Sequence, residues 1–105
     1  MGLNSLETEE NRELFQKLQS DIWLELADIY INQRKNKTKA FFYLQRAGNR
    51  ISNKSIQDIQ VAIRWNMLMS IYFSTLEKDR EQGKYYLDKT ESLKGKLRQI
   101  GVLQF

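Results

Sequence analysis

The chain of 105 residues contains no cysteine, no histidine and no proline. Without cysteine it has no disulfide and no thiolate nucleophile, and without histidine it lacks the commonest general base and metal ligand. No apolar run approaches the ~20 residues that a membrane-spanning helix needs, and the acidic start is unlike a signal peptide. We therefore expect a soluble, cytoplasmic protein that is not an enzyme and that needs no cofactor or metal.

The missing proline, only five glycines and an excess of good helix formers indicate an all-α protein. The chain has no alternating strand pattern and no Asn-Gly hairpin turn. Polar segments divide the sequence into four expected helices: Leu6 to Arg34, Lys37 to Ile51, Ser55 to Leu76, and Asp79 to Gln99. Ser55 and Asp79 are residue types that cap helix starts, and Gly101 is a candidate cap for the last helix end.

An internal repeat organises these helices into two hairpins. A first set of residues recurs at an offset of 42, namely Trp23, Leu26, Ala27 and Tyr30 as Trp65, Leu68, Met69 and Tyr72. A second set recurs at an offset of 43, namely Ala40, Tyr43, Leu44 and Ala47 as Gly83, Tyr86, Leu87 and Thr90. We therefore expect one domain over residues 1–105, with repeats over about 6–51 and 55–99 and an apolar tail over 100–105.

These spacings resemble the tetratricopeptide repeat, whose motif is Trp-x2-Leu-Gly/Ala-x2-Tyr on a first helix and Ala-x3-Phe/Leu-x2-Ala on a second. The first copy fills every position of this motif, whereas the second copy departs from it at Met69 and Thr90. The resemblance covers roughly residues 21–92 and implies two stacked antiparallel helical hairpins, forming a short solenoid or bundle. It also implies a protein that binds other proteins or peptides.

The faces of the two long helices decide where a partner would bind. On the first helix, a wide apolar sector that includes Phe15, Leu18, Ile22 and Trp23 is expected to pack in the core. The opposite face of that helix and a stripe on the third helix are the expected partner-binding surface, with cover of the stripe by the fourth helix or the tail as the alternative. Its candidate residues are Asp21, Leu24, Glu25, Asp28, Ile59, Ile63, Asn66, Met67 and Ser70.

The charge distribution leaves a second kind of partner open. Residues 1–31 carry seven acidic and two basic residues, whereas residues 32–105 carry six acidic and fifteen basic ones. Four basic residues, Arg34, Lys35, Lys37 and Lys39, cluster between the first two helices, where they could contact the phosphates of a nucleic acid. A solvated loop is the plainer interpretation of that cluster. Opposite charge on the two halves also favours head-to-tail or antiparallel association.

Repeat arrays usually need three or more copies, because each hairpin covers its apolar face by stacking on the next. With two copies, this chain is expected to form a homodimer, to join a larger assembly or to be a piece of a longer array. The leading hypothesis is a small adaptor or assembly subunit. A peptide-responsive regulatory domain is an alternative, because the long-period repeats of Gram-positive peptide-pheromone regulators resemble this pattern too.

Overall fold

The computed structural model describes residues 9–52 and 55–102, and this part of the chain is helical apart from short connections. Its elements are α2 (Glu9–Asp28), the π-helix η1 (Ile29–Gln33), α3 (Lys37–Gly48), α4 (Ile56–Thr75) and α5 (Arg80–Val102). The prediction of an all-α fold is thus confirmed. Residues 6–8 of the expected first helix lie outside the described residues.

The helix starts follow the capping chemistry in the sequence. Ser55 caps α4, because its hydroxyl accepts a hydrogen bond from the Asp58 backbone N–H at 3.1 Å. Asp79 caps α5 by accepting from the Gln82 N–H, also at 3.1 Å. The start of α3 has the same arrangement, with Asn36 accepting from the Lys39 N–H at 3.0 Å.

Two helix ends differ from expectation. The second helix ends at Gly48 rather than at Ile51, because the Arg50 and Ile51 N–H groups bond to the carbonyl oxygens three residues back, at Ala47 and Gly48, in place of the helical four. The last helix continues to Val102, so Gly101 lies inside α5 and does not cap it. Of the expected apolar tail, residues 100–102 are therefore helical, and residues 103–105 lie outside the described part.

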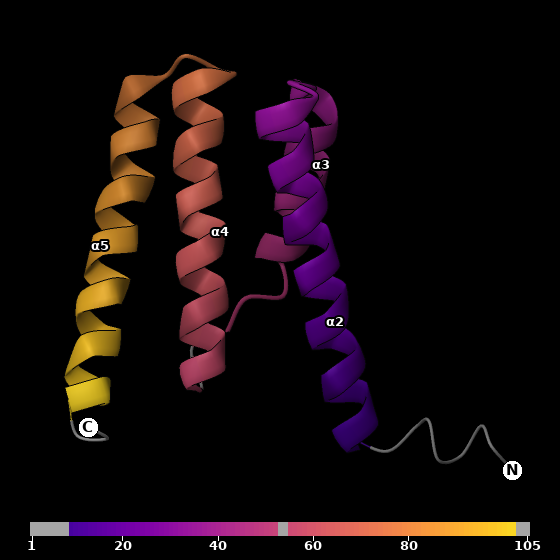
Figure 1. The fold of residues 1–105 in the computed structure, drawn as a ribbon, viewed down its shortest axis with the longest axis vertical. Helices are drawn as coiled ribbons and strands as arrows, with labels where there is room; N and C mark the ends of the chain where they lie inside the picture. Colours follow the sequence, from indigo (N-terminus) through magenta and orange to yellow (C-terminus); the bar gives the residue numbers. More distant parts are fainter. Residues whose placement is uncertain (1–8, 53–54, 103–105) are drawn as a thin grey trace, which may run out of the picture.

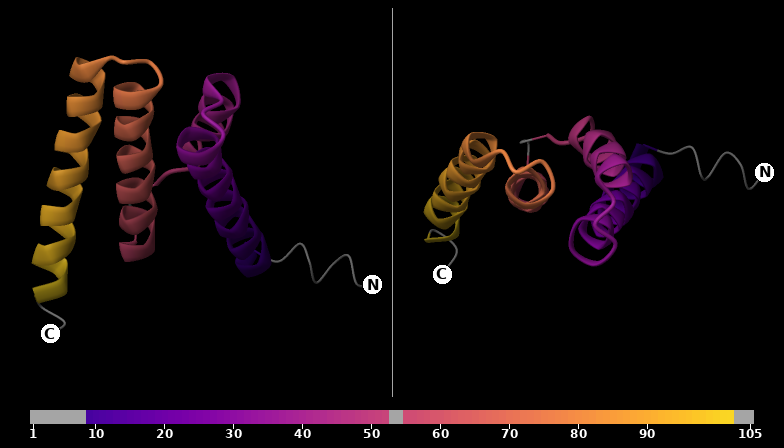
Figure 2. Two further views of the ribbon diagram at one scale, coloured as in Figure 1. Left: turned by 45° about the horizontal axis from the view of Figure 1, so that its top comes forward. Right: turned by 90° about the horizontal axis from the view of Figure 1, so that it is seen from above.

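The helices form two antiparallel hairpins, α2–α3 and α4–α5, with α4 in the middle (Figures 1 and 2). α4 contacts both helices of the first hairpin as well as α5, as expected for a helix that is apolar nearly all round. The core between the hairpins contains Leu24, Ala27, Ile31, Ala40, Leu44, Ala47, Leu68, Met69 and Tyr72.

The two hairpins repeat the same contacts at an offset of 43 residues. Lys35 and Lys78 both adopt positive φ, at 53° and 55°, directly before the capping residue of the next helix. At both turns the capping residue's backbone N–H reaches back six residues, from Asn36 to Tyr30 and from Asp79 to Phe73. The same turn therefore joins the two helices of each hairpin, although α5 is longer than α3 and only the first hairpin contains a π-helix.

The aromatic packing changes the register read from the sequence. Tyr30 stacks on Tyr43 with ring centroids 5.8 Å apart, and Phe73 stacks on Tyr86 at 5.6 Å. Phe73, and not Tyr72, is therefore the structural counterpart of Tyr30. Tyr72 instead faces the first hairpin and packs on the Phe41 ring. The first helices of the two hairpins thus correspond at 43, like the second helices, and not at the expected 42.

Candidate functional site

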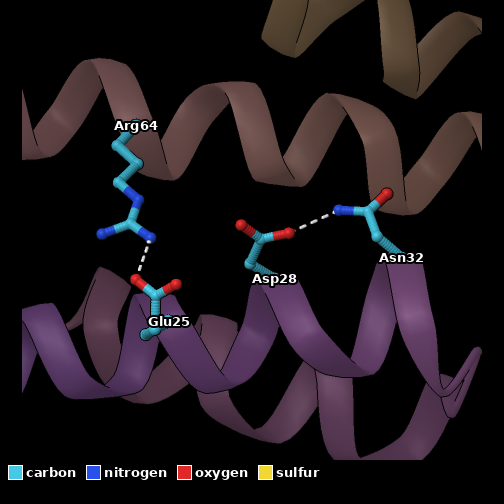
Figure 3. A network of polar contacts seen from close by, with 4 residues as sticks. All are labelled: Glu25, Asp28, Asn32 and Arg64. Atoms are coloured by element: carbon cyan, nitrogen blue, oxygen red, sulfur yellow. Dashed lines mark hydrogen bonds and ion pairs between the residues drawn. The ribbon is translucent and has the colours of Figure 1, made fainter.

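Three acidic residues of α2, Asp21, Glu25 and Asp28, are here called the acidic ridge, and two of them face α4 in Figure 3. Arg64 of α4 donates a hydrogen bond to Glu25 at 2.7 Å, and the Asn32 side-chain amide donates to Asp28 (Figure 3). The third ridge residue, Asp21, is half-buried on the same helix. Two of the three carboxylates thus have partners inside the chain, which leaves less of this charge available to a basic partner.

The prediction that Leu24 belongs to the exposed surface of α2 is wrong. Leu24 is fully buried in the core between the hairpins, together with Ala27 and Ile31. Ser20 is buried on the same side of the helix. The side of α2 that faces the core is therefore the one that carries Ser20, Leu24 and Ala27, where small residues permit close helix approach.

Most of the expected stripe on α4 is covered as well. Ile59, Asn66 and Ser70 share one face of α4 and are buried, contrary to the prediction that they meet a partner. The Ser70 hydroxyl donates to the Gly83 carbonyl oxygen of α5 at 2.7 Å, which places this face against α5. Ile63 is half-buried, and only Met67 remains 37% exposed.

Asn66 brings a polar group into that α4–α5 contact. Its side-chain amide donates to the Ala62 carbonyl oxygen at 2.8 Å. Within the described residues, its Oδ1 atom is buried and has no hydrogen-bond partner. Burial of an acceptor without a hydrogen-bond partner has a cost in the free energy of folding.

The most exposed apolar surface lies on the outer side of α2, where the sequence predicted core. We call it the outer stripe, and it consists of Leu14 (57% exposed), Phe15 (62%), Leu18 (52%) and Ile22 (56%). Leu14, Leu18 and Ile22 lie four positions apart and Phe15 lies three before Leu18, so the four residues line one side of the helix. A row of large apolar side chains exposed to water is typical of an interaction surface.

The basic cluster between α2 and α3 is partly used inside the chain. Lys37 forms an ion pair with Glu77 at 3.4 Å, and the Lys39 ammonium lies 5.3 Å from the centre of the Tyr30 ring. Arg34 and Lys35 are exposed at the turn itself. Two of the four basic residues therefore already make contacts inside the chain.

Glu77 also ties the end of α4 to the first hairpin. It accepts a hydrogen bond from the Tyr72 hydroxyl at 2.7 Å while pairing with Lys37 of α3. Burial, followed by the neighbouring Glu77 carboxylate, raises the pKa of the Tyr72 hydroxyl well above its ordinary value. The hydroxyl therefore stays protonated at neutral pH and keeps donating to Glu77.

The described part of the chain has two surface pockets. One, of about 360 Å³, lies over α4 and is lined by aromatic residues that include Phe41, Trp65, Phe73 and Tyr86. The other, of about 660 Å³, is lined mainly by polar and charged side chains from α2, the start of α4 and the segment before it. Within residues 9–52 and 55–102, no three acidic side chains gather as a metal site would require.

Comparisons with known proteins add no family. No family model, curated protein or solved structure matches this chain. The described helices include none that is long and apolar enough to cross a membrane. The surface of the chain is therefore the basis for inferring its function.

Proposed function

We propose that this chain is a non-catalytic, cytoplasmic protein-interaction module of the tetratricopeptide type, a small adaptor or assembly subunit. It acts by burying the outer stripe of α2 against a protein surface. The observation that carries the proposal is the exposure of Leu14, Phe15, Leu18 and Ile22, each more than half accessible. Covering such side chains is favourable, at roughly 25 cal/mol for each Å² of apolar area removed from water.

The chemistry of the outer stripe favours a protein partner over a nucleic acid. Nucleic acids are bound mainly through cations that contact phosphates, with aromatic residues that stack on bases. The stripe offers three aliphatic side chains and one phenylalanine, on a helix with six acidic and two basic residues. An apolar surface on an acidic helix repels phosphates and suits a complementary apolar protein surface.

A site-specific photo-crosslinker tests this proposal in the cells that make the protein. The crosslinking residue replaces Ile22 in the outer stripe and, as a matched control, Ser92 on the exposed side of α5. We expect a discrete crosslinked protein from position 22 that is absent or much weaker from position 92. Equal crosslinking at the two positions, or none at position 22, would contradict the proposal.

A further inference from the structure

The contact between the two hairpins inside the chain shows what kind of surface could cover the outer stripe. On the α4 side, the Trp65 indole donates to the Leu44 carbonyl oxygen of α3 at 2.6 Å. Tyr72 packs on Phe41 of the same helix, with ring centroids 5.7 Å apart. Trp65 and Tyr72, with Val61 beside them, thus form the face of α4 that covers the first hairpin.

The same face exists on α2, where nothing in the described chain covers it. At the structural offset of 43, Val61, Trp65 and Tyr72 correspond to Leu18, Ile22 and Ile29. Leu18 and Ile22 belong to the outer stripe, and Ile29 is half-buried. The outer stripe is therefore the repeat-equivalent of a surface that is already an interface within the molecule.

The receiving surface of that interface also has an exposed counterpart. Leu24 and Leu44 of the first hairpin are fully buried in the contact with the second. Their equivalents in the second hairpin are Met67, which is 37% exposed, and Leu87, which is 47% exposed. The two ends of the molecule thus present the two halves of one interface.

Charge favours the same pairing. α2 carries six acidic and two basic residues, a net charge of −4. α5, at the other end of the molecule, carries six basic and three acidic residues, a net charge of +3. Opposite charges steer two surfaces together, whereas two α2 helices would repel one another.

We infer that the partner of the outer stripe is a second copy of this chain. The α2 helix of one copy packs on Met67 and Leu87 of the next, which continues the internal stack of hairpins from molecule to molecule. This inference rests on the proposed function and names its partner. Because the two contacting surfaces differ, the contact is head-to-tail, and its repetition builds open chains rather than closed two-fold dimers.

The substitutions between the repeats make this contact weaker than the internal one. Phe41, which packs on Tyr72, is replaced in the second hairpin by Lys84. Gly48, where an added Cβ would lie 2.8 Å from the Trp65 ring, is replaced by Glu91, and the smaller Ile22 stands opposite in place of tryptophan. With less apolar contact and more charge, we expect association that is reversible and weakened by salt.

Two charge-introducing variants test the inference, one at each end. Ile22→Glu disables the outer stripe and Leu87→Glu the receiving surface, with Gln16→Glu and Gln99→Glu as exposed controls on the same helices. Sedimentation velocity of the full chain should show a mass that rises with concentration beyond that of a dimer. Each variant alone should be monomeric, and their equimolar mixture should form a dimer that grows no further, since each copy keeps one intact end.

Several results would overturn the inference. A two-fold contact between α2 helices would leave Leu87→Glu dimeric and only Ile22→Glu monomeric. A wild-type chain that stays monomeric at all concentrations, yet crosslinks to a different protein from position 22, overturns the second-copy partner and leaves the proposed function standing. Far-ultraviolet circular dichroism shows whether each variant remains helical, which separates lost association from lost folding.

Discussion

The two hairpins have matching turns and opposite surroundings. In α2–α3, Leu44 is fully buried, because α4 packs over it. In α4–α5 the equivalent residue, Leu87, is 47% exposed, because no described element follows α5. The backbone hydrogen bonds of the two turns match, so the difference comes from position in the stack and not from the local fold. One sequence position thus serves as core in the first copy and as surface in the second.

The first helices of the two hairpins, α2 and α4, differ in the opposite direction, because here the helix of the second hairpin is the better covered one. α4 is covered on two sides, by the first hairpin and by α5, whereas the outer side of α2 is bare. Most of the exposed large apolar residues in the described chain therefore belong to the first helix of the first hairpin and to the last helix of the second, and the exceptions are Phe42 of α3 and Met67 of α4. In a repeat protein these are the two surfaces that another repeat would cover.

The largest predicted effect is a difference in the free energy of unfolding between variants at the equivalent positions Leu44 and Leu87. Leu44→Ala should lower the free energy of unfolding by about 2–5 kcal/mol, since it opens a cavity in a fully buried site. Leu87→Ala should cost below about 1 kcal/mol in the monomer, because the side chain is already half in water. Urea unfolding of both variants at low protein concentration measures the difference. Equal costs would mean that Leu87 is as well covered as Leu44.

The glycines give a second, smaller contrast. Gly48→Ala places a methyl group 2.8 Å from the Trp65 ring, between the hairpins, and overpacking of this kind costs roughly 1–3 kcal/mol. Gly95→Ala, in the second hairpin, meets no atom within 4 Å and should stabilise α5 by roughly 0.5–1 kcal/mol. Thermal unfolding should therefore move in opposite directions for the two variants. A rise in melting temperature for Gly48→Ala would show that the Trp65 ring yields freely.

The fold follows from the sequence wherever the signal is local. The caps at Ser55 and Asp79 fix the starts of α4 and α5, because one side chain and one nearby N–H suffice. The ends at Gly48 and Val102 are less predictable. These ends depend on turn hydrogen bonds and on packing, which no single residue in the sequence indicates.

The candidate site was harder to predict, because it depends on which side of α2 faces inward. This helix carries apolar residues on several sides. Both the side with Leu18 and Ile22 and the side with Leu24 are therefore candidates for the core. The small buried residues Ser20 and Ala27, beside Leu24, are the signal that decides, since they permit close helix approach.

The repeat register was misleading because the two tryptophans, at an offset of 42, do not occupy equivalent places in the two hairpins. The two tryptophans are identical residues, but Trp65 packs between the hairpins, whereas Trp23 lies under Arg46 and Arg50.

The smallest predicted effect concerns a position where the hairpins agree. Asn36→Ala and Asp79→Ala each remove a cap with the same geometry, so each should cost about 1 kcal/mol. Asp79 also places a full negative charge at the positive end of a helix, which adds roughly 0.3–1 kcal/mol at low salt. The loss of unfolding free energy in Asp79→Ala should therefore exceed that in Asn36→Ala in dilute buffer and approach it as salt is added.

Asn36→Asp serves as the control, because it keeps the acceptor and adds the charge, and it should stabilise α3 only at low salt. A difference between the two caps that salt leaves unchanged would show that packing around the two turns differs more than their backbone bonds indicate.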